Sequence, residues 1–195
     1  MNLIKEIQDV LEKKDYKFFT LDKSYNVNII GVRSDDSQSN LFDDMFFMIY
    51  RANGENKIIP SQGTTDPGKY WLEHPMNTDG TFIMKPGQHE GLWRMGLHKG
   101  YKAFVQNKPV TGYRDNNKDQ ILDMDPKTLV KGMFGINMHR SNPYTESYYV
   151  DKWSAGCQVH KKVSVYDQYI DIAERSQHMY GNQFSYTLLE DKDFS

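Results

Sequence analysis

The amino-acid sequence predicts a single domain of the β-rich α+β class. A chain of 195 residues is long enough for one sizeable core. Short apolar or alternating runs, separated by Gly, Pro, Asn and Asp, fill residues 26–115, and one long helical pattern follows only near the end of the chain. Strands and helices do not alternate as they would in a parallel α/β sheet. We therefore expect one unit over residues 1–195.

The first 25 residues predict an N-terminal helix and a lead-in to a body that spans residues 26–195. Apolar side chains recur there at three- and four-residue spacing, which is typical of a short amphipathic helix: Leu3, Ile4, Ile7, Val10 and Leu11. Lys13 and Lys14 follow where the helix should end, and lysines favour a helix C-terminus. We expect this helix to pack on the edge of the body.

The body shows the patterns of several short strands and one long helix. The runs that predict strands are 26–33, 44–51, 56–61, 81–84, 91–98, 102–106, 110–115, 133–140 and 184–190. Residues 164–181 predict the helix, because Ser164 and Asp167 form a starting pair and Gly181 is a stop. Its apolar face should carry Tyr166, Tyr169, Ile170 and Ala173.

Composition indicates an aromatic core and excludes two kinds of partner. The chain has 13 Tyr, 10 Phe, 3 Trp and 10 Met, which bury large areas although they read as only mildly apolar. Its net charge of -2 provides no broad basic face, so nucleic acid is not expected as a partner. The sequence contains neither a signal peptide nor an apolar run of about 20 residues, which predicts a soluble protein without membrane insertion. Its oligomeric state does not follow from these features.

The only cysteine, Cys157, lies in the stretch WSAGCQVH and is the main candidate for chemistry. A cysteine nucleophile needs a base, donors for an oxyanion and a tight turn. Gly156 permits the turn, the amides of Ala155, Gly156 and Cys157 can form an oxyanion hole, and His139 at the end of a predicted strand can be the base. The alternative from residue type alone is a buried structural thiol.

The spacing of these residues resembles a known catalytic signature. The stretch HRSNPYTESYYVDKWSAGC places fourteen residues between His139 and Ser154 and ends in Ser-Ala-Gly-Cys. It resembles the His-x(14 to 17)-Ser/Thr-x-Gly-Cys motif of the L,D-transpeptidase (YkuD-like) catalytic domain. The stretch TTDPGKYW, residues 64–71, is similar to the Thr-Pro-x-Gly-x-Phe segment upstream in that family. The resemblance is concentrated in residues 130–160.

The resemblance implies a β-sandwich catalytic domain that acts on the stem peptides of peptidoglycan without a cofactor. Cys157 would attack a peptide bond and form an acyl-enzyme, with His139 as general base. The backbone carbonyl of Arg140 would orient His139, and Ser154 and Gly156 would shape the turn and the oxyanion hole. An amine acceptor then gives L,D-transpeptidation, whereas water gives L,D-endopeptidase or carboxypeptidase activity.

Two departures from the motif concern substrate recognition. Family members commonly carry an arginine two places after the cysteine, where this chain has Val159, and a basic residue or histidine where it has Ala155. The stretches NIIGVRS and YRDNNKD are similar to small phage-encoded relatives. We therefore favour a phage-type lytic hydrolase (endolysin) that a virion or a holin would deliver to the cell wall, and expect a cytoplasmic protein without such delivery.

Several alternatives stay open at this point. A non-catalytic wall-binding or virion structural protein could keep the same fold around an inert thiol. Cys157 and His160, with His139, offer three zinc ligands but no fourth. The residues Asp115, Asn117, Asp119 and Asp123 have the spacing of calcium ligands, although a polar turn is favoured because Gln120 and Pro126 occupy key loop positions. Further residues that we expect to line the substrate site are His98, Tyr148, Tyr149 and His160.

Overall fold

The structure is a computed structural model that describes residues 2–36 and 39–195. Its helices are α1 (Leu3–Lys13), α2 (Lys69–Glu73) and α3 (Val163–Tyr180), with short 3-10 helices η1 (Pro126–Thr128) and η2 (Asp191–Phe194). The strands are β1 (Asn28–Arg33), β2 (Asp44–Ala52), β3 (Glu55–Thr64), β4 (Thr81–Met84), β5 (Gly87–His98), β6 (Tyr101–Gln106), β7 (Val110–Asp115), β8 (Val130–Gly132), β9 (Met138–Arg140), β10 (Gln158–His160) and β11 (Phe184–Glu190). The β-rich α+β class is confirmed.

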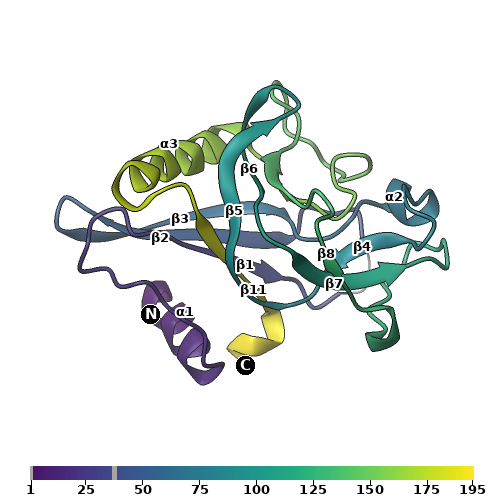
Figure 1. Cartoon of the computed structure of the whole chain (residues 1–195), viewed down its shortest axis with the longest axis horizontal. Helices are drawn as coiled ribbons and strands as arrows, with labels where there is room; N and C mark the ends of the chain where they lie inside the picture. Colours follow the sequence, from purple (N-terminus) through teal and green to yellow (C-terminus); the bar gives the residue numbers. More distant parts are fainter. Residues whose placement is uncertain (1, 37–38) are drawn as a thin grey trace.

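The strands form a closed barrel and a smaller separate sheet (Figure 1). The barrel order is β1-β11-β5-β6-β9-β10-β3-β2, and the second sheet has the order β4-β7-β8. Most neighbours are antiparallel, but β1 pairs with β11 and β9 pairs with β10 in parallel. The architecture therefore differs from the β-sandwich that the family resemblance implied, because the hydrogen-bonded strands close on themselves.

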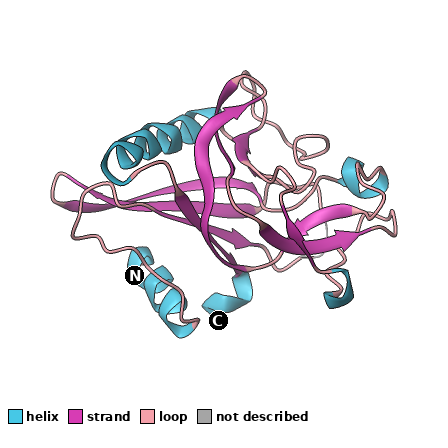
Figure 2. Cartoon of the chain, in the orientation of Figure 1, coloured by secondary structure: helices cyan, strands magenta, loops and turns pink. Residues whose placement is uncertain are grey.

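Helix α3 packs along one side of the barrel, as Figure 2 shows. The expected face is buried in the structure. It carries Tyr166, Tyr169, Ile170 and Ala173. The helix ends at the predicted glycine, Gly181, but it begins at Val163 with Lys162 as N-cap. The predicted starting pair is therefore wrong, because Ser164 lies inside the first turn and makes no capping bond.

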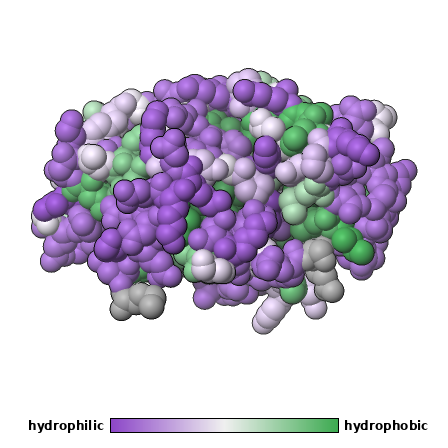
Figure 3. Space-filling view, turned by 90° about the horizontal axis from the view of Figure 1, so that it is seen from below, coloured by the Kyte–Doolittle hydropathy of each residue, from purple (hydrophilic) through white to green (hydrophobic). Residues whose placement is uncertain are grey.

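The barrel interior is aromatic and rich in methionine, as composition predicted. Trp93 lies at its centre with its ring 4.5 Å from that of Tyr186, and its indole N–H donates to the Ile136 carbonyl. The buried Tyr186 hydroxyl donates to the side-chain oxygen of Gln158 over 2.7 Å. Buried phenols are thus hydrogen-bonded, and the surface in Figure 3 is mostly hydrophilic with smaller hydrophobic areas.

Helix α1 covers the outer face of the barrel where β1, β2 and β11 are paired. Its buried side chains Ile7, Val10 and Leu11 share a second apolar cluster with strand residues such as Phe47 and Leu189. Strand β1 is consequently buried on both faces, one toward the interior and one toward α1. No helix in the described ranges is both long and apolar enough to cross a membrane.

The predicted strand 133–140 is extended only at its end. Residues 138–140 form β9, whereas residues 133–137 run as an irregular segment. The buried side chain of Gln106 replaces a strand partner there, because its Oε1 accepts from the amides of Phe134 and Ile136, both over 2.9 Å. Gly135 adopts φ +72, which ladder geometry does not allow.

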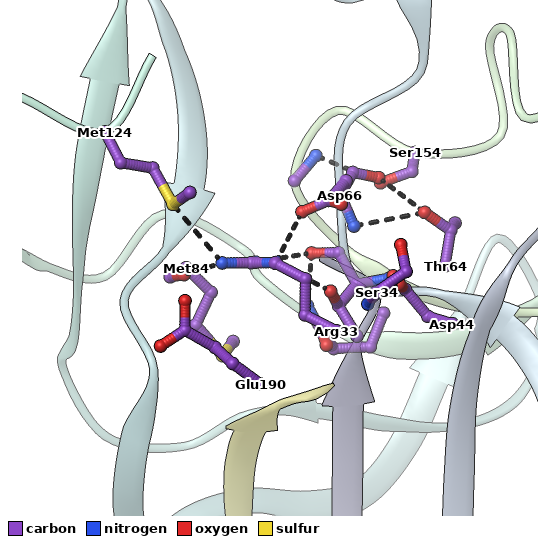
Figure 4. A network of polar contacts seen from close by, with 12 residues as sticks. Arg33, Ser34, Asp44, Thr64, Asp66, Met84, Met124, Ser154 and Glu190 are labelled. Atoms are coloured by element: carbon purple, nitrogen blue, oxygen red, sulfur yellow. Dashed lines mark hydrogen bonds and ion pairs between the residues drawn. The ribbon is translucent and has the colours of Figure 1, made fainter. Parts of the chain in front are cut away.

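A buried ion pair lies at one end of the barrel, beyond β1 (Figure 4). Arg33 is 2% exposed, and its Nε lies 2.8 Å from Oδ1 of Asp66. The neighbouring Asp44 is also buried and accepts from the amides of Ser34 and Thr65. Burial raises the pKa of Asp66 to about 7 despite the guanidinium. Arg33 is therefore the cation that offsets carboxyl groups removed from water.

We predict that Arg33→Met lowers the free energy of unfolding by about 3–5 kcal/mol at pH 9, where Asp66 is ionised in the parent protein and the substitution leaves buried carboxylates unpaired. The loss should be smaller at pH 5, where Asp66, whose folded pKa lies above the unfolded value, takes up a proton and becomes neutral. Urea denaturation at the two pH values measures both effects. Lys57→Met, which breaks an exposed pair with Glu55, is the control and should cost less than about 1 kcal/mol. An equal loss at both pH values would contradict this account.

Candidate active site

A cavity of about 630 Å³ lies where the β4-β7-β8 sheet meets the end of the barrel. Both Cys157 and His139 line it, together with His98 and Ala155 among the residues that the sequence proposed. Other parts of its wall come from α2, β4, β7 and the irregular segment 133–137: Trp71, Thr81, Phe82, Arg114, Met133, Phe134, Gly135 and Ile136. The candidate nucleophile and base therefore share one cavity.

The tight turn before Cys157 is held by Ser154. The buried Ser154 hydroxyl donates to the Cys157 carbonyl over 2.8 Å and accepts from the Gly156 amide over 3.1 Å. Gly156 has φ +114, and a Cβ at this position would lie 2.5 Å from the Phe82 carbonyl oxygen. Only glycine fits there, because both the backbone angle and the approach of β4 exclude a side chain.

The hydrogen bonds of the turn revise the predicted oxyanion hole. The Gly156 amide is occupied by Ser154, so it is not free to bind a substrate oxygen. Within the described ranges, the amides of Ala155 and Cys157 have no hydrogen-bond partner in the protein. The expected set of three amides is therefore reduced to two.

The Cys157 thiol is half-buried and lies against the irregular segment 133–137. Its sulfur is 3.5 Å from the Asn137 amide nitrogen and 3.6 Å from the Gly135 carbonyl oxygen. Burial raises the pKa of the thiol above its usual range, and the Asn137 amide offsets only part of that effect. The resting form at neutral pH is thus the thiol, which needs a base to become a nucleophile.

His139 lines the same cavity, and within residues 2–36 and 39–195 its ring makes no hydrogen bond to the thiol. Its Nδ1 lies 2.9 Å from the Arg140 carbonyl oxygen, which is the geometry that the resemblance implied. A carbonyl can only accept, so we assign the proton of the neutral ring to Nδ1 and the lone pair to Nε2. The ring is 3% exposed, and burial, followed by His98, lowers its pKa to about 3. His139 is therefore neutral at neutral pH.

The Arg140 side chain points away from this chemistry. Its guanidinium lies over the ring of Tyr101 at 4.1 Å and donates to the Ser141 carbonyl. It does not line the cavity, so the predicted contribution of Arg140 is limited to its backbone.

Three cations line the cavity instead of the motif arginine. They are Lys99, Arg114 and Lys152, and no acidic side chain of the described ranges lines it with them. The Arg114 guanidinium lies 4.7 Å above the Phe134 ring. Val159, at the motif position, is buried in the barrel wall opposite Thr64 and supplies no polar group. Positive charge thus reaches the cavity from other elements.

The prediction that His160 lines the substrate site is wrong. His160 is 0% exposed, and its ring lies 4.8 Å from Phe46 and 4.6 Å from Tyr169 in the barrel interior. Its Nδ1 is 2.7 Å from the Ser61 hydroxyl oxygen. The zinc alternative fails with it, because strand alternation turns His160 away from the cavity that Cys157 lines.

The loop tyrosines also lie outside the cavity. Tyr148 is 82% exposed, Tyr149 pairs with Leu41 through an isolated bridge, and neither contributes to the cavity wall. The expectation that they line the substrate site is therefore wrong in this conformation. The connection between base and nucleophile passes over the surface instead.

The Asp/Asn loop after β7 is organised by hydrogen bonds. Asn117 donates through its amide nitrogen to the carboxylates of Asp119 and Asp123, and the Asp123 amide donates to Asp115. No group of three or more His, Cys, Asp or Glu in residues 2–36 and 39–195 is arranged to hold a metal ion. The arrangement is that of a polar turn.

Sequence reasoning missed several residues of the cavity wall. Asn137 contacts the sulfur, and Trp71 and Arg114 come from separate elements whose meeting point is a tertiary feature. The stretch 64–71, which is similar to a segment of the family that the sequence resembles, was the one sequence feature that indicated this part of the cavity wall. Its Gly68 amide donates to the Ser154 carbonyl over 2.8 Å, and the Trp71 indole donates to the Lys152 carbonyl. This stretch therefore lies directly beside the cysteine turn.

Comparison of the chain with protein-family models, curated proteins and solved structures gives no match.

We predict that Gly156→Ala destabilises the fold by at least about 2 kcal/mol, because it combines an unfavourable φ with a clash against a backbone oxygen. Gly181→Ala is the matched control. Its φ is +88 but its Cβ would meet nothing within 4 Å, so about 1 kcal/mol is expected. Urea denaturation compares the two, and equal losses would show that the Phe82 carbonyl does not enclose the turn.

We predict that the thiolate of Cys157 forms at a higher pH than that of an ordinary cysteine, because burial raises its pKa. The rate of alkylation by iodoacetamide should keep rising beyond pH ~8.5, where a free thiol begins to level off. Mass spectrometry measures the rate, and the protein unfolded in urea provides the ordinary reference. A plateau below pH 7 would instead indicate a resting thiolate and imidazolium pair.

Proposed function

We propose that the chain is a cysteine enzyme of the L,D-transpeptidase type that acts on peptidoglycan stem peptides through a Cys157 acyl-enzyme. The observation that carries the proposal is the presence of Cys157 and His139 on the wall of one cavity, with His139 Nδ1 bound to the Arg140 carbonyl. This arrangement leaves Nε2 as a base for the thiol. The motif spacing in residues 139–157 supports the same chemistry.

The proposed reaction proceeds by acyl transfer. Nε2 of His139 takes the thiol proton while the sulfur of Cys157 attacks the peptide carbonyl carbon. The amides of Ala155 and Cys157 stabilise the oxyanion. The C–N bond then breaks, and His139 returns the proton to the leaving amine. Water or an amine attacks the resulting thioester, with His139 again accepting the proton, and regenerates the thiol.

The charge of the cavity supports a peptide that carries free carboxylates. Lys99, Arg114 and Lys152 line the wall, and no acidic side chain of the described ranges lines it with them, so the wall favours an anionic substrate. They would replace the cation that Val159 does not supply. Whether water or an amine is the acceptor depends on access to the thioester, and we retain the lytic hydrolase as the favoured form.

We predict that incubation with purified stem peptides and muropeptides yields cleaved, exchanged or enzyme-linked products in mass spectra. Cys157→Ala should abolish them, and His139→Ala should reduce their rate about 100-fold or more, because general base catalysis contributes that much. The exposed His178→Ala is the control and should be unchanged. Peptides whose carboxylates are amidated should react more slowly. If no product or adduct depends on Cys157, the non-catalytic wall-binding alternative is favoured.

A further inference from the structure

His98 and His139 form a stacked pair on the wall of the cavity. Their ring centroids lie 4.2 Å apart with an interplanar angle of 9°. His98 comes from the end of β5 and His139 from β9, so two distant parts of the chain supply the pair. Burial lowers the pKa of both rings, and two charged imidazoles in contact would repel. Both histidines are therefore neutral at neutral pH.

The hydrogen bonds of the two rings assign them opposite tautomers. His139 donates from Nδ1 to a carbonyl, as described above. His98 Nδ1 lies 3.1 Å from Nδ2 of Asn137, an amide nitrogen that can only donate. The side-chain amide of Asn137 cannot be flipped to exchange its oxygen and nitrogen, because its Oδ1 accepts from the Gln106 backbone amide over 2.9 Å. The proton of His98 is therefore on Nε2.

The remaining N–H of His98 has no acceptor among residues 2–36 and 39–195. His98 is half-buried and lines the cavity together with His139 and Cys157. The side-chain amide of Asn137 binds His98, and the backbone amide of Asn137 contacts the sulfur. His98 therefore carries a donor without an acceptor in the described part of the chain and lines the cavity that a substrate would occupy. The turn itself offers at most the amides of Ala155 and Cys157, because the Gly156 amide is engaged by Ser154.

We infer that His98 Nε2–H is a third oxyanion donor, which binds the carbonyl oxygen of the group that Cys157 attacks. No proton leaves His98 in this step: His139 accepts the thiol proton, and His98 stabilises the negative oxygen by a hydrogen bond. The inference rests on the proposed acyl-transfer function and adds a catalytic residue to it. In the stacked pair, His139 thus acts as the base and His98 as the hydrogen-bond donor.

The test uses N-acetyl-alaninal, an aldehyde that forms a reversible hemithioacetal with a reactive cysteine. Its affinity is measured by protection of Cys157 from iodoacetamide. His98→Phe keeps a flat ring against His139 but removes the donor, and should weaken aldehyde binding about 10- to 100-fold. His98→Gln places an amide nitrogen near the position of Nε2 and should recover part of the loss. His178→Phe, at an exposed histidine, should bind like the parent protein.

The controls separate a donor from a structural role. Without aldehyde, the alkylation rate of each variant is measured as its own reference, because removing His98 also changes the pKa of His139, and protection by the aldehyde is expressed relative to that rate. NMR of ¹⁵N-histidine-labelled protein should show the proton of His98 on Nε2 and that of His139 on Nδ1. A proton on Nδ1 of His98, undiminished aldehyde binding by His98→Phe, or no aldehyde binding by the parent protein would each overturn the inference.

The same measurements distinguish this inference from the proposed function. If aldehyde binding depends on His98 but no stem peptide gives an acyl-enzyme, the role of His98 as a donor is supported and the proposed peptidoglycan substrate is contradicted. If stem peptides acylate Cys157 while His98→Phe binds the aldehyde normally, the function stands and the donor is wrong.

Discussion

The parallel pairing of β9 with β10 is the constraint on which the site depends. Its register sets His139 opposite Val159, two residues after the cysteine. A parallel pair requires a long crossover, and residues 141–157 supply it. The crossover ends in the cysteine turn, so His139 and Cys157 reach one cavity although seventeen residues separate them in the chain. Any change that shifts this register by one residue would turn His139 away from the cavity.

The barrel interior fixes strand β10, which follows Cys157. The Gln158 side chain is buried, accepts from the Tyr186 hydroxyl and donates to the Thr65 carbonyl over 3.2 Å. That carbonyl also accepts from Arg33. The buried ion pair and the aromatic core therefore converge on the residue next to Cys157. Such support holds the candidate site on rigid elements, and the proposed acyl transfer would require this because its donors must be aligned before reaction.

Local patterns predicted the elements, whereas tertiary contacts decided their arrangement. Alternation and spacing were sufficient for α1, α3 and most strands, because each has a one-sided or fully apolar pattern. The short strand β10 gave no such signal within WSAGCQVH, and closure of the barrel depends on its pairing with β3 and β9. The side chain of Gln106, which holds residues 133–137 out of a strand, comes from another part of the chain and is invisible to a local pattern.

The same division applies to the site. The spacing of His139 and Cys157 predicted two residues that line the cavity, and the backbone contact of Arg140 has the expected geometry. His160 was misplaced because a residue three positions from a nucleophile is near it in sequence, while the strand directs its side chain to the interior. Asn137 was missed because its contacts to sulfur, His98 and Gln106 exist only after folding.

The arrangement is tested most directly by NMR of the histidine rings before and after alkylation of Cys157 by iodoacetamide. We expect the ring signals of His139 and His98 to shift, because both share the cavity with the modified sulfur, while the signals of the buried His160 stay in place. A shift of His160 with unchanged His139 would show that the base does not face the thiol, and would contradict the account.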